Sequence, residues 1–192
     1  LMRNREELAP FSVPIAMIEP LQMVVYVFPI DGELPALVGA TDPGRMTEIF
    51  NQTLPETRTG RFIARDCRVV LINYARRSRC VMRYEITGTA PGSNQPVGHV
   101  VYGKVTTDGE GALIGPGLAA LGAHLSTSGS ACSFSVPRAL GFRADLGLSL
   151  LEAVPGEPRI NVMLKARMNG AEEPPCGVQT LEEAIASCGR IA

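Results

Sequence analysis

Hydrophobic and polar residues alternate most clearly in the middle of the chain, where they predict β-strands. Residues 67–74 and 79–87 are rich in β-forming side chains and are separated by the short basic turn 75–78. Such a pair of runs is expected to form a hairpin. In the second run alternation divides the side chains between two faces, with Cys80, Met82, Tyr84 and Ile86 on one and Arg79, Val81, Arg83, Glu85 and Thr87 on the other.

A third strand is predicted at residues 99–105, which read His-Val-Val-Tyr-Gly-Lys-Val. Alternation places Val100, Tyr102 and Lys104 on one face, and His99, Val101 and Val105 on the other. The lysine is one of two among 18 basic residues, so this strand has an ammonium where the chain otherwise uses guanidinium groups. A strand lysine commonly lays its stem on apolar surface and reaches water with its charge. The alternative is that it binds a ligand.

The flanking regions predict further elements. A proline-rich arm over residues 1–20 precedes a strand at 21–30, and Asp42 and Pro43 favour a helix at 43–53. A helix is expected from about Pro116, with strands at 136–142 and 146–152 after it. Near the end, Thr180 and Glu183 form a capping box, which predicts a helix over residues 180–192.

Composition indicates a soluble globular domain. The chain has 192 residues, 45% of them hydrophobic, a formal net charge of −1 and no apolar run near 18 residues, so no membrane span is expected. Five cysteines without a C-x-x-C pair favour reduced thiols and a cytoplasmic location. The two histidines, His99 and His124, have no ligand-type neighbours in sequence, so no metal site is expected.

Arginine is concentrated between residues 61 and 83, where seven arginines accompany a single aspartate. This local excess of positive charge attracts anions. Nucleic acid is one candidate partner. However, the arginines fall on both sides of a hairpin, aromatic residues are few and the chain is slightly acidic overall, so nucleic acid is not expected as the partner. A solvated strand face is the simplest interpretation of most of them.

The order of these elements resembles a known family. A hairpin, a third strand with Val-Tyr-Gly-Lys at 101–104, a helix and two strands precede Leu-Leu-Glu-Ala-Val-Pro-Gly at 150–156 and an amphipathic helix. This succession resembles the nucleotide-binding lobe of the aminoglycoside phosphotransferase family, the kinase-like small-molecule phosphotransferases. The resemblance covers roughly residues 61–192.

The resemblance implies an α+β fold in which a kinase-like N-terminal lobe has an antiparallel five-stranded sheet with one packed helix. Residues 1–60 would form an extension made of an arm, a strand and a short helix, and residues 61–192 the lobe. The C-terminal helix would lead toward a second, catalytic lobe, so the chain is expected to be truncated before it.

An ATP site is implied by the same resemblance. Lys104 corresponds to the third-strand lysine that binds the α- and β-phosphates. The adenine would meet the Tyr102 ring and a hinge over Glu152, Ala153 and Val154, in which the Glu152 carbonyl and the Val154 NH face the base. The basic turn would cover the phosphates through three residues, Arg76, Arg77 and Ser78.

The implied activity is transfer of the γ-phosphate of ATP to a hydroxyl of an aminoglycoside-like or other small substrate. No His-Gly-Asp loop and no metal-binding aspartate motif occur in the sequence, so no catalytic residue is assigned here. Mg²⁺ would be held by the second lobe, and this fragment alone is expected to be inactive. The turn 75–78 lacks glycine, and the nearest glutamate able to hold the lysine is Glu110. These departures favour the alternative, a degenerate, non-catalytic kinase-like regulator or scaffold.

Overall fold

The computed structural model describes residues 15–93, 95–107, 109–127, 136–154 and 168–170. The chain divides into two compact units, residues 1–154 and 155–192. All strands and helices described below belong to the first unit. The predicted helix at 180–192 lies outside the described residues, as do Cys132, Cys176 and Cys188.

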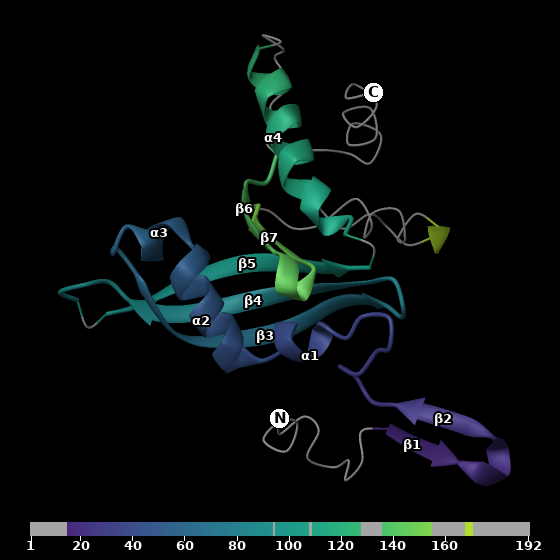
Figure 1. Cartoon of the computed structure of the whole chain (residues 1–192). Helices are drawn as coiled ribbons and strands as arrows, with labels where there is room; N and C mark the ends of the chain where they lie inside the picture. The colour runs from purple at the N-terminus through teal and green to yellow at the C-terminus, as the bar shows by residue number, and fades with distance from the viewer. Residues whose placement is uncertain (1–14, 94, 108, 128–135, 155–167, 171–192) are drawn as a thin grey trace. The chain divides into compact units, whose positions relative to one another are not determined.

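The first unit is built on a five-stranded antiparallel sheet (Figure 1). Its strands are β3 (Ile63–Ala75), β4 (Arg79–Thr89), β5 (Pro96–Thr106), β6 (Ala139–Arg143) and β7 (Leu148–Glu152). They lie side by side in the order β3-β4-β5-β7-β6, so β5 is the central strand. The predicted α+β class with a five-stranded antiparallel sheet is confirmed.

The predicted hairpin is formed by β3 and β4. Cys67 pairs with Ile86, and Tyr74 pairs with Cys80. Two irregularities interrupt the register on β3, between Ala64 and Asp66 and between Leu71 and Asn73. Each is an extra residue that bends the strand and locally breaks the ladder of hydrogen bonds.

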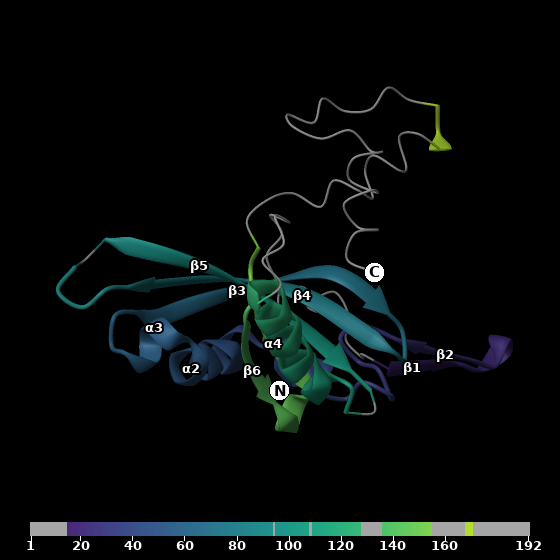
Figure 2. The same ribbon diagram turned by 90° about the horizontal axis from the view of Figure 1, so that it is seen from above.

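Helix α2 (Pro43–Thr53) covers one face of the sheet (Figure 2). Asp42 caps it, because its side chain accepts a hydrogen bond from the Arg45 backbone NH at 2.9 Å, and Pro43 occupies the first helical position as predicted. Its buried residues are Met46, Ile49 and Phe50. They meet the apolar face of β4, which confirms the predicted alternation of Cys80, Met82, Tyr84 and Ile86.

The core includes residues on both sides of position 60, where the sequence predicted a domain boundary. Helices α1 (Leu37–Ala40) and α3 (Pro55–Arg58) flank α2. The Asn51 side-chain amide exchanges two hydrogen bonds with the backbone of Ala64 on β3, at 2.9 and 3.0 Å. Residues 34–54 therefore pack in the same core as the strands. The helix that buries the apolar sheet face precedes the sheet in sequence.

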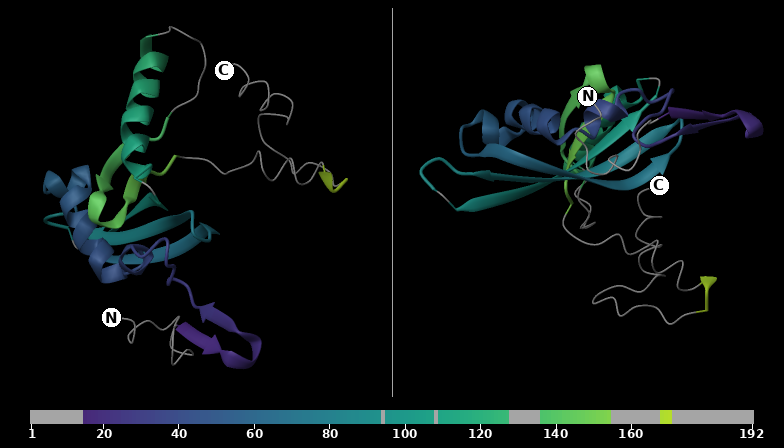
Figure 3. Two further views of the ribbon diagram at one scale, coloured as in Figure 1. Left: turned by 45° about the vertical axis from the view of Figure 1, so that its right-hand side comes forward. Right: turned by 90° about the horizontal axis from the view of Figure 1, so that it is seen from below.

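Helix α4 (Gly111–Thr127) connects β5 to β6 and begins five residues earlier than predicted, so that Pro116 lies inside it. Its contacts with the sheet are mainly to β6 and β7, and its length projects away from the sheet (Figure 3). The strands β6 and β7, predicted at 136–142 and 146–152, pair antiparallel and are joined by the 3-10 turn η3 (Ala144–Leu146).

A separate two-stranded sheet consists of β1 (Ile15–Ile18) and β2 (Met23–Tyr26), linked by the 3-10 turn η2 (Glu19–Leu21). The sequence predicted one longer strand at 21–30. Most of the side chains of β1 and β2 are exposed although they are apolar. Among the helices in the described residues, none combines the length and the apolar character that crossing a membrane requires.

Candidate functional site

Lys104 lies on the central strand β5, on the face opposite the core. Val101, Gly103 and Val105 are buried in the core, whereas Tyr102 and Lys104 are half-buried on the other face. The predicted division of this strand into two faces is therefore confirmed. We call the face that carries Tyr102 and Lys104 the open face, and the opposite one the core face.

Gly103 explains how the Tyr-Gly-Lys sequence fits the fold. A Cβ atom at this position would lie 2.5 Å from Cε2 of Tyr84 and 2.9 Å from Cδ1 of Leu148. The Tyr84 ring thus occupies the space above the glycine. Its hydroxyl donates a hydrogen bond to the Ala40 carbonyl at 2.8 Å, and its ring packs edge-on against Phe50 at 5.2 Å. Burial raises the pKa of Tyr84, so its hydroxyl stays protonated.

The strands next to β5 complete the open face. On β4, Arg83 lies opposite Tyr102 and Val81 lies opposite Lys104. On β7, Leu151 and Ser149 take the corresponding positions. The open face thus combines the basic side chains of Arg83 and Lys104 with Tyr102 and the apolar Val81 and Leu151, whereas Ser149 is buried.

The beginning of α4 is fastened beside the open face. The Ser149 hydroxyl donates to the Gly111 carbonyl at 2.7 Å, and the Gly111 NH donates to the Thr106 hydroxyl at 3.0 Å. Gly111 is required here, because a Cβ atom would lie 2.9 Å from Oγ of Ser149. Two strands, β5 and β7, therefore fix the start of the helix.

The predicted hinge residues follow directly from β7. Glu152 ends the strand opposite Val101, so its side chain belongs to the core face. Its NH donates to the Arg138 carbonyl at 2.9 Å, and its carboxylate lies 3.5 Å from Nε of Arg138. Ala153 and Val154 continue the chain beyond the strand, and Val154 is 47% exposed.

The basic turn joins β3 to β4 and lies level with the C-terminal end of β5, since Arg79 is opposite Thr106. Lys104 therefore lies between the hinge and the basic turn. Arg77 adopts a positive φ of 64°, and its NH donates to the Asp31 carboxylate at 2.8 Å. The Tyr74 hydroxyl donates to the same carboxylate at 2.6 Å. Asp31 thus anchors the turn, a role that the sequence alone did not indicate.

Electrostatics support this anchor. Burial of Asp31 opposes its ionisation, but hydrogen bonds from Tyr74 and from the backbone NH groups of Arg77 and Glu33 outweigh burial, so the pKa of Asp31 lies below its usual value. Burial, together with the hydrogen bond to Asp31, raises the pKa of Tyr74 to about 12. The carboxylate is therefore charged and the phenol neutral at physiological pH.

The side chains of the predicted turn residues have partners close by. The Arg76 guanidinium lies 5.8 Å from the centre of the Tyr26 ring, and the Arg77 guanidinium lies 3.4 Å from the Glu33 carboxylate. Ser78 donates its backbone NH to the Ala75 carbonyl at 3.1 Å. Both arginines are thus directed to residues 26–33.

Arg79 was not among the predicted site residues, although its alternation placed it on the same face as Arg83. Arg68 and Arg83 both contact the Glu85 carboxylate, whose pKa is lowered chiefly by the hydrogen bond from Arg83. By contrast, neither Arg79 nor Lys104 forms an ion pair within the described part of the chain. The two are diagonal neighbours on adjacent strands, which corresponds to about 7–8 Å between their positions.

The candidate groups are arranged in order along β5, from its middle to its C-terminal end. The hinge begins level with Val101, Tyr102 and Lys104 lie next along the strand, and the basic turn lies level with Thr106. Five residues of an antiparallel strand span about 17 Å. Tyr102, Lys104 and Arg79 are brought together on one face, whereas the Glu152 side chain lies on the other.

A glutamate partner for Lys104 is missing from α4. Residues 111–127 contain neither Asp nor Glu, and Glu110 is exposed just before the helix. Among the described residues, no group of three His, Cys, Asp or Glu side chains is placed to hold a metal ion. The described cysteines, Cys67 and Cys80, are buried, and burial raises their pKa values to about 12 and about 11, which disfavours the reactive thiolate.

A scan against protein-family models and searches of curated proteins and of solved structures found no match to this chain.

Proposed function

We propose that this chain is the nucleotide-binding lobe of an ATP-dependent, kinase-like phosphotransferase, and that ATP lies on the open face of the sheet. The proposal rests chiefly on one observation. Lys104 and Arg79 are neighbouring cations with no ion-pair partner in the described residues, and they lie on the same face as Tyr102. Cations without a carboxylate partner are suited to the charge-assisted hydrogen bonds that phosphates accept.

The order of these residues along β5 supports one direction for the bound nucleotide, with the adenine near Glu152 and the phosphates near Lys104. Backbone groups at Glu152 and Val154 would meet the adenine edge, and the Tyr102 ring would lie on its face. The phosphates would then extend toward Lys104 and Arg79. Lys104 contributes a compact positive charge on a flexible stem, whereas Arg79 offers a planar fork of donors.

The catalytic groups and the phosphate acceptor are not assigned to residues of this chain. Mg²⁺ would neutralise phosphate charge when bound, and no described residue is proposed as its ligand. The proposed contribution of the chain is to bind and orient ATP. Arg76 and Arg77 remain predicted phosphate contacts, and they would have to leave Tyr26 and Glu33 to reach the nucleotide.

The test is calorimetric titration of the 192-residue protein with ATP and with adenosine. Lys104→Ala and Arg79→Ala should each weaken ATP about tenfold and leave adenosine unchanged. Tyr102→Ala should weaken both ligands about ten- to a hundredfold, because base stacking contributes about 1–3 kcal/mol. Thr87→Ala, on the same face but level with Gly98, is the control and should bind like the unmodified protein. Equal loss of ATP and adenosine in the Lys104 variant would contradict the phosphate assignment.

One observation favours a second candidate, a kinase-like module without catalytic activity. In active protein kinases the strand lysine pairs with a helix glutamate, and α4 has no acidic residue to offer. A scaffold or regulator does not need that ion pair. If the folded protein binds neither ATP, ADP nor adenosine at millimolar concentration, the scaffold is favoured over the nucleotide-binding lobe.

A further inference from the structure

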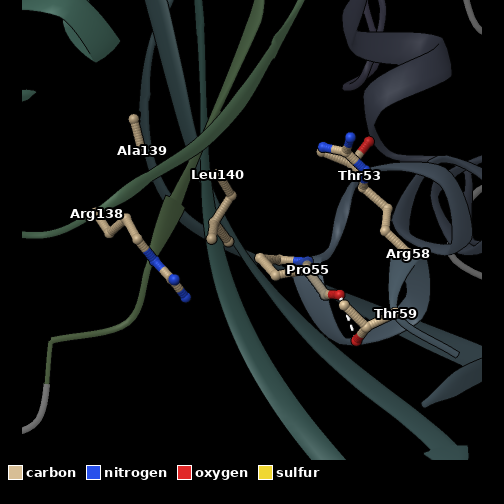
Figure 4. Close-up of a pocket in the computed structure, with 7 residues that line it drawn as sticks. All are labelled: Thr53, Pro55, Arg58, Thr59, Arg138, Ala139 and Leu140. Atoms are coloured by element: carbon tan, nitrogen blue, oxygen red, sulfur yellow. Dashed lines mark hydrogen bonds between the residues drawn. The ribbon is translucent and has the colours of Figure 1, made fainter. Parts of the chain in front are cut away.

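An open groove lies between α3 and the beginning of β6, and it shares no lining residue with the open face (Figure 4). Its volume is about 380 Å³. The lining residues come from the end of α2, from α3 and its C-cap, and from β6 and the residue before it: Thr53, Pro55, Arg58, Thr59, Arg138, Ala139 and Leu140. We call it the α3–β6 groove.

Two arginines line the groove on opposite walls. Figure 4 shows Arg138 extending from the β6 side and Arg58 from the α3 side. Arg58 makes no ion pair within the part of the chain that the structure describes. A guanidinium presents donors in a planar fork that matches a carboxylate or a phosphate, so the groove favours an anionic group.

Apolar and hydroxyl groups line the rest of the groove. Pro55 and Leu140 supply carbon surface between the arginines, and Ala139 adds to it beside Arg138 (Figure 4). The Thr59 hydroxyl donates to the Pro55 carbonyl at 2.9 Å, which leaves its oxygen free to accept a hydrogen bond. A ligand that complements both kinds of surface carries an acidic group and a compact apolar part.

Arg138 already has a carboxylate neighbour, and changing this neighbour tests whether Arg138 binds an anion. The Glu152 carboxylate lies 3.5 Å from Nε of Arg138, and both side chains are about half exposed, at 49% and 56%. An exposed pair of this kind is weak, so an incoming anion can compete with Glu152 for the guanidinium. Removing the Glu152 charge should therefore strengthen anion binding.

We propose that the α3–β6 groove binds a small organic anion, a carboxylate or a phosphate with a compact apolar group, through Arg58 and Arg138. This site is distinct from the proposed ATP site, since none of its lining residues is among those assigned to ATP on β4, on β5, in the basic turn or in the hinge at 152–154. It gives the chain a second ligand, for which neither the sequence motifs nor the nucleotide proposal accounts.

The experiment titrates the full chain with phenyl phosphate, benzoate, inorganic phosphate and benzyl alcohol, following backbone amide shifts by NMR. Phenyl phosphate or benzoate should bind more tightly than inorganic phosphate, and the neutral alcohol least tightly, with shifts at Thr59 and Ala139. The stronger of the two aromatic anions identifies the acidic group. Arg58→Ala and Arg138→Ala should each weaken binding about tenfold, whereas Arg65→Ala, an exposed arginine on β3 outside the groove, should not.

Two further variants separate this site from the alternatives. Glu152→Gln should tighten anion binding severalfold, a gain that structural damage would not produce. Tyr102→Ala should leave it unchanged, even where it weakens ATP. Binding that is insensitive to both groove arginines, equally sensitive to Arg65→Ala, or accompanied by shifts only on the open face would overturn the proposal.

Discussion

The two faces of β5 use the same strand in opposite ways. On the core face, the Tyr84 ring fills the space where a side chain at position 103 would lie, and Val101 and Val105 are nearly inaccessible to solvent. On the open face, Tyr102 and Lys104 retain exposed surface, and the lysine has no ion-pair partner in the described residues. The core face is determined by close packing, whereas the open face keeps solvent-accessible side chains and a charge that the described part of the fold does not pair.

This difference separates the effects expected from mutation. Substitutions on the core face should change the free energy of unfolding, because protein interiors are close-packed. Substitutions on the open face should change ligand affinity while the fold persists. Four measurements can break or sharpen this contrast.

The largest effect is expected at Phe50, which is fully buried and packs against Tyr84. Phe50→Ala should lower the free energy of unfolding by about 3–5 kcal/mol, as a lost aromatic core residue does. Urea denaturation followed by circular dichroism measures it. Tyr102→Ala is the open-face counterpart and should cost less than about 1 kcal/mol, the range of a cross-strand pair. Similar losses in both variants would abolish the distinction between the faces.

Asp31 should come next, because its buried carboxylate accepts hydrogen bonds that fix the basic turn. Asp31→Asn should cost about 1.5–3 kcal/mol at neutral pH, as hydrogen bonds to a charged group do. The folded pKa is lowered, so this stabilisation is complete above the unfolded pKa of about 4 and is lost as the pH falls through the folded value.

Unfolding of both proteins between pH 7 and pH 2 checks this dependence. The difference in stability between wild type and Asp31→Asn should shrink as the solution becomes acidic. Glu48→Gln, an exposed change of the same kind on α2, is the control and should show little difference at any pH. A wild-type advantage that stays constant down to pH 2 would show that the Asp31 charge is not responsible.

Gly103 should tolerate little enlargement. Gly103→Ala places a Cβ atom within 2.5 Å of the Tyr84 ring and should cost about 1–3 kcal/mol through overpacking. Gly98→Ala on the same strand is the matched control, since its Cβ atom would lie 3.9 Å from the Ile86 carbonyl oxygen, an ordinary van der Waals distance. Chemical denaturation of the two variants tests the assignment, and equal stabilities would refute it.

The smallest effect is expected from the Tyr84 hydroxyl. Tyr84→Phe removes its hydrogen bond to the Ala40 carbonyl and should cost about 0.5–1.5 kcal/mol. Tyr26→Phe, at a tyrosine that is 44% exposed, should be neutral and serves as the control. Thermal unfolding resolves the pair. A more stable Tyr84→Phe protein would mean that the hydroxyl is not satisfied by Ala40.

Alternation along single strands predicted the faces of β4 and β5 correctly, because its period of two is a local property of extended backbone. The helix at 43–53 could be predicted from Asp42 and Pro43, because helix capping is also determined by residues adjacent in sequence. Which helix would cover the sheet could not be predicted, because that choice depends on contacts between segments distant in sequence. The Asn51 and Ala64 pair is such a contact.

The candidate site likewise has a part that local sequence predicts and a part that it does not. Alternation along β5 predicts that Tyr102 and Lys104 share a face. Alternation along β4 likewise predicts the face of Arg79, although Arg79 was assigned no role from the sequence. The partners of Arg76 and Arg77 could not be read from the sequence, since Tyr26 and Glu33 lie more than 40 positions away. The ATP assignment itself stays a prediction from the resemblance and from the placement of these side chains.

The irregularities on β3 bear on how the sheet meets other chains. This strand is an outer edge of 13 residues, and a regular edge of that length would offer its free backbone groups to a strand from another molecule. The two bulges interrupt that row, and Arg65 at the first of them adds charge. Leu71 and Ile72, 46% and 50% exposed, lie where the second bulge breaks the edge. The strand is thereby a poor template for edge-to-edge aggregation, and deleting Ile72 would straighten the second bulge and weaken that protection.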